Sequence, residues 1–317
     1  MKKTRPARTI LSQSALAILI AYFLVCMILQ PAKYISQSLN GITAWAFNVL
    51  PSVLPFMFFT KILSSASAVE SASRPFSVAT TRLFKTPAIS AYTFLMAILS
   101  GYPVGSRMIA DLYLQGKISR QAAFKMSSFC STSGPMFIIG AVGVGMFQSA
   151  KIGYVLFASH ILGAIANGIC WRNLKTKNDA NETNSLPTQT EKPTLSDIVT
   201  NSTLSILSVG CLITIFFIII ETLSPLFSFF PSALQGFLEG TIEITKGSIS
   251  LSALPNKTLA TILCSFVISF GGISTILQSI TMLNKVKMPT SLFVLQKLTH
   301  ALLSCIATVL IVLVFGV

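Results

Sequence analysis

Charged residues, and acidic ones above all, are scarce in this chain of 317 residues. Only 10% of its residues are charged, with 9 Asp and Glu against 23 Lys and Arg, whereas soluble domains contain about 25% charged residues. Hydrophobic residues make up 52% of the chain, and the mean hydropathy is +0.74. This composition excludes an ordinary water-soluble domain and predicts an all-α polytopic membrane protein.

Patterns typical of metal sites and catalytic sites are also missing. None of the cysteines forms a CxxC pair, and all lie in apolar stretches, so they indicate small membrane-helix residues rather than a disulfide framework or a zinc site. They are Cys26, Cys130, Cys170, Cys211, Cys264 and Cys305. No nucleophile–base pair or metal-ligand cluster is visible, so we expect neither an enzyme nor a bound cofactor. The net charge of +14 does not indicate nucleic-acid binding, because the basic residues lie between apolar stretches.

A polar linker divides the chain into two halves. Residues 173–197 are rich in Asn, Thr, Glu and Lys and show no periodicity. We therefore predict an N-terminal tail and first span at 1–40, a first repeat with a connecting span at 41–172, the cytoplasmic linker at 173–197, and a second repeat at 198–317. The apolar run 10–29 is too long for the core of a signal peptide, so it is interpreted as a retained first span.

Two apolar stretches are interrupted by glycine near their centres. The stretch 88–114 contains Gly-Tyr-Pro-Val-Gly at 101–105, and the stretch 257–283 contains Gly271-Gly272. Each half is much shorter than the roughly 20 residues that a helix needs to cross a bilayer. Each stretch is therefore predicted to be a re-entrant hairpin, whose tip is tolerated only beside a polar cavity. Paired interruptions of this kind indicate a transport site.

The two halves repeat one order of segments, namely a full span, an amphipathic stretch, a broken stretch and a further span. In the second half, Leu234, Phe237 and Leu238 share one helical face while Glu239 and Glu243 lie on another, which is typical of an interfacial helix. With two hairpins, most Lys and Arg fall on one side, predicted to be cytoplasmic. The fold is then two inverted repeats, each with an interfacial helix, a re-entrant hairpin and a broken transmembrane helix. Both termini are predicted to be cytoplasmic.

The tip of the first hairpin is predicted to bind an anion. Glycine and proline leave backbone groups free there, the half-helix that begins at Ser106 directs its positive end to the site, and Arg107 adds a charge. The tip residues in this prediction are Gly101, Tyr102, Pro103, Gly105, Ser106 and Arg107. Alternatively, Arg107 pairs with Asp111 at i,i+4 and only holds the hairpin together.

The span that follows carries hydroxyl groups where it faces this tip. Ser131, Thr132 and Ser133 precede a Gly-Pro pair within the stretch 122–147, which predicts an unwound segment in contact with the hairpin. The alternative is an ordinary proline kink whose backbone groups are satisfied by serine and threonine. His160 lies in the middle of the next span, where a buried neutral histidine is favoured over a proton relay.

The second half supplies corresponding residues. Its predicted substrate contacts are Gly271, Gly272, Ser274 and Gln278 at the tip, and Lys297 and His300 on the last span. The two tips are expected to meet near the middle of the membrane. An alternative is that Lys297, close to the start of its span, extends to the membrane interface.

Four short runs resemble the YlbJ family of sporulation integral membrane proteins. They are GYPVGSR at 101–107, FCSTSGP at 129–135, IGAVGVGMF at 139–147 and FGGIS at 270–274. The resemblance covers nearly the whole chain. It implies a nucleoside recognition, or Gate, domain, shared in outline with concentrative nucleoside transporters. It also implies a role in spore formation, with transport of dipicolinate as the proposed activity.

Residues and resemblance together predict a transporter in the bacterial cell membrane for a small anionic metabolite, with dipicolinate as the substrate that the resemblance implies. The alternatives are a transporter of a nucleoside or related metabolite and a non-transporting membrane scaffold. The tip at 101–107 lacks the acid and amide of nucleoside transporters, and polar hinge points at membrane depth argue against a scaffold. The expected partners are the lipid bilayer and the anion, not nucleic acid. A coupling ion and an oligomer are both compatible with this prediction.

Overall fold

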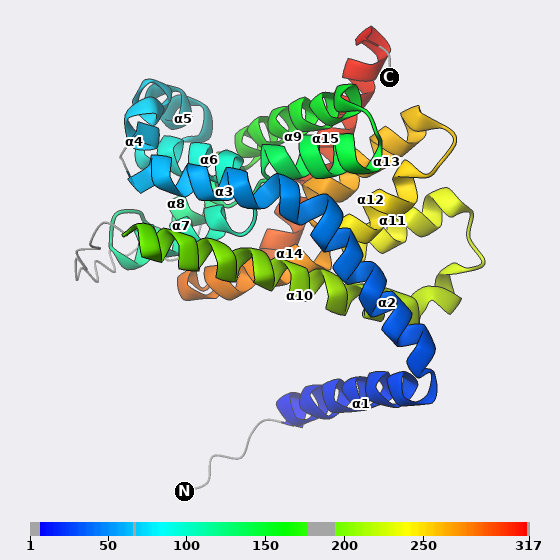
Figure 1. Ribbon diagram of the computed structural model, residues 1–317. Helices are drawn as coiled ribbons and strands as arrows, with labels where there is room; N and C mark the ends of the chain where they lie inside the picture. The colour runs from blue at the N-terminus through cyan, green and yellow to red at the C-terminus, as the bar shows by residue number, and fades with distance from the viewer. Residues whose placement is uncertain (1–6, 66–67, 176–193, 316–317) are drawn as a thin grey trace, which may run out of the picture.

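The protein is an all-α polytopic membrane protein, as the composition predicts. The computed structural model describes residues 7–65, 68–175 and 194–315 (Figure 1), and these residues form helices and no strand. Five helical segments among them are long and apolar enough to cross a membrane, namely Pro31–Leu63, Ala150–Trp171, Leu195–Phe227, Lys257–Val286 and Thr290–Phe315. A sixth candidate is a helix pair, Ser71–Phe84 with Ile89–Ser100, which is bent by 103°.

The first half of the chain begins with a separate helix and continues into a long one. Its helices are α1 Ala7–Leu29, α2 Pro31–Ala44, the π-helix η1 Trp45–Val49, α3 Leu50–Ser65, α4 Ala68–Ser73, the 3₁₀ turn η2 Arg74–Phe76, α5 Ser77–Phe84, α6 Ile89–Ser100, α7 Val104–Leu114, α8 Arg120–Met126, the π-helix η3 Met136–Met146 and α9 Ala150–Trp171. α1 lies to one side of the other helices (Figure 1). α2, η1 and α3 follow one another without interruption, so the predicted boundary between residues 40 and 41 falls inside a helix.

The second half has fewer and longer elements. They are α10 Leu195–Phe227, α11 Ser232–Ile242, α12 Ile244–Ser252, α13 Lys257–Phe270, α14 Gly272–Leu283, the 3₁₀ turn η4 Asn284–Val286 and α15 Thr290–Phe315. Residues 176–193 of the predicted linker lie outside the described residues. α10 begins with a capping box, in which Thr194 and Asp197 satisfy each other's backbone N–H groups.

α15 runs antiparallel to α9. Near one end, the indole N–H of Trp171 donates a hydrogen bond to the hydroxyl of Thr299 at 3.0 Å. Near the other end, the ammonium of Lys151 donates to the carbonyl of Phe315 at 3.4 Å. The end of α9 that leads to the linker is therefore opposite to the end that contacts the C-terminal residues. The prediction that the linker and the C-terminus are both cytoplasmic is wrong, because the two lie at opposite ends of one membrane-spanning helix.

The stretch 88–114 enters and leaves at one end of α9. The ammonium of Lys85, just before α6, donates to the side-chain oxygen of Asn173 at 2.7 Å. The amide of Gln121, at the start of α8, donates to the carbonyl of Leu174 at 2.7 Å. Since both flanks contact the residues that lead into the linker, α6 and α7 have the geometry that a re-entrant hairpin requires.

The stretch 257–283 is not a hairpin, and this prediction is wrong. α13 and α14 run on as one broken segment, Lys257–Val286. Its two ends pack at different places: Leu254, before α13, joins the cluster around Ile152 at the start of α9, whereas Val286 joins the cluster that contains Leu174. Gly271 and Gly272 form the break with positive φ, and the chain runs on because α13 packs against α15 while α14 packs against α7.

The hairpin of the second half is instead formed by α11 and α12, where an interfacial helix was predicted. The chain reverses at Glu243, whose backbone is extended, and this residue is 4% exposed. The two helices approach so closely that a Cβ on Gly247 would collide with the backbone of Gly240. Small residues allow such contact between helices in a membrane. The acidic residues, which had suggested a solvated face, form hydrogen bonds within the hairpin. The hydroxyl of Ser250 donates to the carboxylate of Glu239.

Candidate substrate cavity

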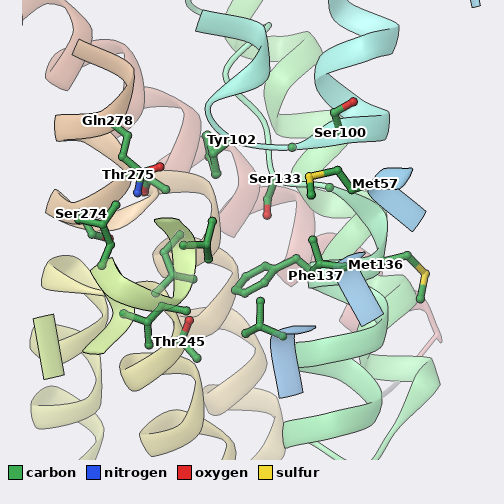
Figure 2. Close-up of a pocket in the computed structure, with 18 of the residues that line it drawn as sticks. Met57, Ser100, Tyr102, Ser133, Met136, Phe137, Thr245, Ser274, Thr275 and Gln278 are labelled. Atoms are coloured by element: carbon green, nitrogen blue, oxygen red, sulfur yellow. The ribbon is translucent and has the colours of Figure 1, made fainter. Parts of the chain in front are cut away.

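A cavity opens where interruptions in four helical segments meet. Its volume is about 100 Å³. Its walls come from the break between α6 and α7, the non-helical stretch 127–134 (hereafter the unwound stretch), the tip between α11 and α12, and the first turns of α14. Figure 2 shows Tyr102 and Ser133 facing Ser274, Thr275 and Gln278 across this space. The sequence prediction that the breaks of both halves approach one another agrees with this arrangement.

Most of the cavity wall is apolar, and the polar groups come from the interrupted segments. The apolar residues are Val49, Val53, Phe56, Met57, Leu99, Met136, Phe137, Val209, Leu212, Ile213 and Ile244. The others are Ser100, Gly101, Tyr102, Ser133, Gly134, Glu243, Thr245, Ser274, Thr275 and Gln278. An apolar enclosure with a few convergent polar groups is typical of a site for a small molecule.

The first hairpin packs directly on the unwound stretch because glycines line the crossing. A Cβ on Gly101 would lie 2.7 Å from the backbone nitrogen of Gly134, and a Cβ on Gly105 would collide with the carbonyl of Cys130. Gly101 also has a φ of +73°, a conformation that favours glycine. The predicted contact between hairpin tip and unwound segment is therefore present in the structure.

A histidine of α9 holds the end of the unwound stretch that faces the cavity. Nε2 of His160 accepts a hydrogen bond from the backbone N–H of Ser133 at 2.9 Å, so the ring proton lies on Nδ1 and donates to the hydroxyl of Ser269 at 2.8 Å. His160 is 1% exposed. It links the unwound stretch to the last turn of α13, which is the structural role favoured from the sequence.

Amide side chains satisfy the other end of the unwound stretch. The amide of Asn167 donates to the carbonyl of Ser128 at 2.7 Å, and the amide of Gln296 donates to the carbonyl of Phe124 at 2.8 Å. Both side chains are fully buried. Backbone groups released by a broken helix must find partners inside a membrane, and α9 and α15 supply them here.

Lys297 lies behind the cavity wall rather than at the membrane interface. Its side chain is 2% exposed. The ammonium donates to the hydroxyl of Tyr102 at 2.6 Å and to the carbonyl of Ser131 at 2.9 Å. The alternative that Lys297 extends to the interface is therefore wrong. Tyr102 itself lines the cavity.

Several other predicted contacts lie next to the cavity without lining it. His300 is buried and donates from Nε2 to the carbonyl of His160 at 3.1 Å. Gly271 lies beside Tyr102, since a Cβ there would be 3.5 Å from the phenolic oxygen. The hydroxyls of Ser131 and Thr132 are buried without a hydrogen-bond partner. Pro103, Gly105, Ser106 and Gly272 are likewise close to the breaks but absent from the wall.

Arg107 is the predicted contact that the structure removes from the site. Its side chain is 70% exposed, and Nε lies 3.9 Å from the carboxylate of Asp111. It does not line the cavity. The reason is the direction of α7: Ser106 faces inward and is 1% exposed, so the next position of the helix faces outward. The alternative, an i,i+4 pair with Asp111, describes the structure.

The N-terminal turns of three helices line the cavity, whereas Arg107 does not. The first turns of η3, α12 and α14 supply Phe137, Thr245 and Ser274 to its wall. The N-terminal end of a helix carries a partial positive charge and unpaired N–H groups. The ends of η3 and α14 favour a ligand that accepts hydrogen bonds or carries negative charge, whereas the carboxylate of Glu243 already caps α12.

Glu243 and Thr245 are wall residues that the sequence reading missed. Their helices were assigned to an interfacial element, so both were expected at the membrane surface. The carboxylate of Glu243 accepts a hydrogen bond from the backbone N–H of Lys246 at 2.8 Å and caps α12. The signal that could have located them is the glycine spacing at positions 236, 240 and 247, which indicates two closely packed helices around this acid.

A comparison with known proteins finds a similar sequence. The chain is 27% identical to the sporulation integral membrane protein YlbJ of Bacillus subtilis (strain 168), over an alignment that covers 90% of this chain and 79% of the relative. No family model matches the chain. No solved structure matches it either.

Proposed function

We propose that this protein is a carrier of the bacterial cell membrane and that the cavity at the helix breaks binds its substrate. The observation that carries the proposal is the meeting of interrupted segments from both halves around one cavity. Broken helices cost hydrogen bonds inside a membrane, so they persist where they serve a site. In secondary transporters the substrate site is formed by such discontinuous helices near the midplane.

The order of elements supports an inverted pair of repeats. In the first half, the long segment α2–α3 is followed by the hairpin α6–α7, the broken segment α8–η3 and α9. In the second half, α10 is followed by the hairpin α11–α12, the broken segment α13–α14 and α15. We place the linker in the cytoplasm. Lys285 and Lys287, which precede α15, then lie on that side too, since Val286 packs in the same cluster as Leu174. This strengthens the positive-inside bias.

The composition of the cavity wall favours, as substrate, a small anion with a flat apolar part. Phe56, Phe137 and Tyr102 supply aromatic surface, and the N-terminal turns of η3 and α14 in the wall can offer N–H groups to carboxylate oxygens. The relative is named as a sporulation protein. Dipicolinate, an aromatic dicarboxylate, satisfies both considerations, and we propose it as the substrate during spore formation. The carrier needs no catalytic residue or cofactor for this activity.

A nucleoside is the second candidate, because the structure adds an acid and an amide to the cavity. Glu243 and Gln278 both line the wall. A carboxylate and an amide can bond the hydroxyls and the base of a nucleoside, whereas a carboxylate would repel a dicarboxylate. The two candidates thus predict opposite consequences of removing the charge of Glu243.

Uptake by proteoliposomes that contain the purified full-length chain tests the proposal. Labelled dipicolinate and labelled uridine are compared for the wild type and for Glu243→Gln, which keeps an oxygen to cap α12. We expect saturable uptake of dipicolinate, unchanged or faster in Glu243→Gln. Uptake of uridine that falls at least about tenfold in this variant, the scale of one lost charged hydrogen bond, would establish the nucleoside instead. Liposomes that accumulate neither compound would contradict both assignments.

A further inference from the structure

Lys297 is a buried lysine whose hydrogen bonds go only to oxygen acceptors. Its ammonium donates to the hydroxyl of Tyr102 and to the carbonyl of Ser131. In the part of the chain that the structure describes, no carboxylate lies within ion-pair distance of it. An unpaired charge inside a membrane is costly and marks a functional position.

The oxygens around Lys297 come from the interrupted segments. Ser131 belongs to the unwound stretch, and Tyr102 belongs to the tip of the first hairpin. The hydroxyl of Tyr102 in turn donates weakly to the carbonyls of Ile268 and Ser269, at 3.4 and 3.5 Å, in the last turn of α13. Unwound carbonyls and the C-terminal ends of half-helices are the groups that coordinate sodium ions in secondary transporters.

The position of the ammonium is fixed by its surroundings. The final carbon of the side chain, Cε, lies 3.5 Å from where a Cβ on Gly271 would be. The nitrogen lies 4.6 Å from the centroid of the Tyr102 ring, an additional cation–π contact. The ammonium therefore contacts the first hairpin and the unwound stretch directly, and it is linked to the last turn of α13 through the hydroxyl of Tyr102. A bound cation at this point would hold the same three segments together.

We propose that the ammonium of Lys297 replaces a coupling sodium ion, so that the carrier assembles its site and works without sodium. The inference rests on the proposed transport function, since a coupling ion has meaning only in a carrier. A tethered ammonium and a sodium ion both carry one positive charge and both bind carbonyl and hydroxyl oxygens. Removal of the ammonium leaves the oxygens of Ser131 and Tyr102 turned toward an empty space that a hydrated sodium ion can enter.

The test compares melting temperatures of the purified full-length chain in sodium chloride and in choline chloride at equal ionic strength. We expect the wild type to melt at one temperature in both salts. Lys297→Ala should melt lower in choline chloride and gain on the order of 2–4 °C in sodium chloride. Lys246→Ala is the matched control, because Lys246, like Lys297, places its ammonium over an aromatic ring, at 5.3 Å from the Phe217 ring on α10. It should respond to sodium as the wild type does.

The proposal is overturned if sodium shifts the wild type, or if sodium shifts Lys297→Ala no more than it shifts the wild type. Lys297→Ser, which also leaves the space empty, replaces Lys297→Ala if the alanine variant cannot be purified, and the same two outcomes decide. This measurement uses no substrate, so it remains decisive if proteoliposomes transport neither dipicolinate nor uridine. Where transport is seen, replacing sodium by choline on both sides of the membrane should change the wild-type rate by less than about twofold.

Discussion

His160 and Ser133, on separate segments of the first half, are joined by a hydrogen bond of 2.9 Å from the backbone N–H of Ser133 to Nε2 of the histidine. Through its other ring nitrogen, the same imidazole bonds the hydroxyl of Ser269 in the second half. One buried side chain thus ties the unwound stretch to the broken segment α13–α14. The shape of the cavity wall at Ser133 depends on this link.

Replacing His160 by leucine should therefore destabilise the protein. The backbone N–H of Ser133 would be left buried without a partner, at a cost of about 1–3 kcal/mol. His160→Gln keeps an acceptor and should lose less. The melting temperature of the purified chain in detergent is the measurement. A leucine variant as stable as the wild type would show that this hydrogen bond does not hold the unwound stretch.

The crossing of the first hairpin over the unwound stretch predicts a contrast between two glycines. Gly105→Ala places a Cβ against the carbonyl of Cys130 and should destabilise the chain by about 1–3 kcal/mol. Gly134→Ala is the control, because its Cβ would come no closer than 3.5 Å to Gly101. Thermal melting of both variants checks this, and equal melting temperatures would mean that the two segments can separate.

The corrected path of the second half predicts a labelling pattern. Lys85, Lys257 and Lys285 are exposed residues before α6, at the start of α13 and after α14. Each is replaced by cysteine in a cysteine-free background. Positions 85 and 285 should react from one side of the membrane and position 257 from the other. If positions 257 and 285 react from the same side, the stretch between them is a hairpin after all.

Arg107 should be dispensable for transport. Its exposed side chain and its 3.9 Å separation from Asp111 describe a surface ion pair, which contributes about 0–1 kcal/mol. Arg107→Ala is therefore expected to change the rate of dipicolinate uptake by less than about threefold. If this variant melts like the wild type but loses uptake, Arg107 contacts the substrate during transport and this prediction is wrong.

The sequence was sufficient to predict where helices are interrupted, but not whether the chain turns back or continues at each interruption. Gly101, Gly134 and Gly271 mark real breaks, because glycine and proline remove helix constraints wherever they occur. Whether the two halves of a broken stretch fold back or run on is decided by what each half packs against. α13 packs along α15 and α14 contacts α7, and neither contact has a local signal in the sequence.

The candidate site was likewise found in part. Tyr102, Ser133 and Ser274 were identified because hydroxyls beside a glycine break are unusual within apolar spans. Glu243 was missed because an acid on an amphipathic stretch indicates a solvated face unless its helix is known to be buried. Arg107 was misplaced because a sequence does not state which side of a short half-helix faces the cavity.

The rate at which a cysteine in the cavity reacts, with and without substrate, tests the central claim most directly. Thr275→Cys in a cysteine-free background puts a thiol on the wall formed by α14. The account predicts that a bulky thiol reagent blocks uptake, and that saturating dipicolinate slows the labelling several-fold, while a cysteine at the exposed Lys257 reacts at an unchanged rate. A labelling rate at position 275 that is the same with and without substrate, in protein that still transports, would contradict the claim that the substrate occupies this cavity.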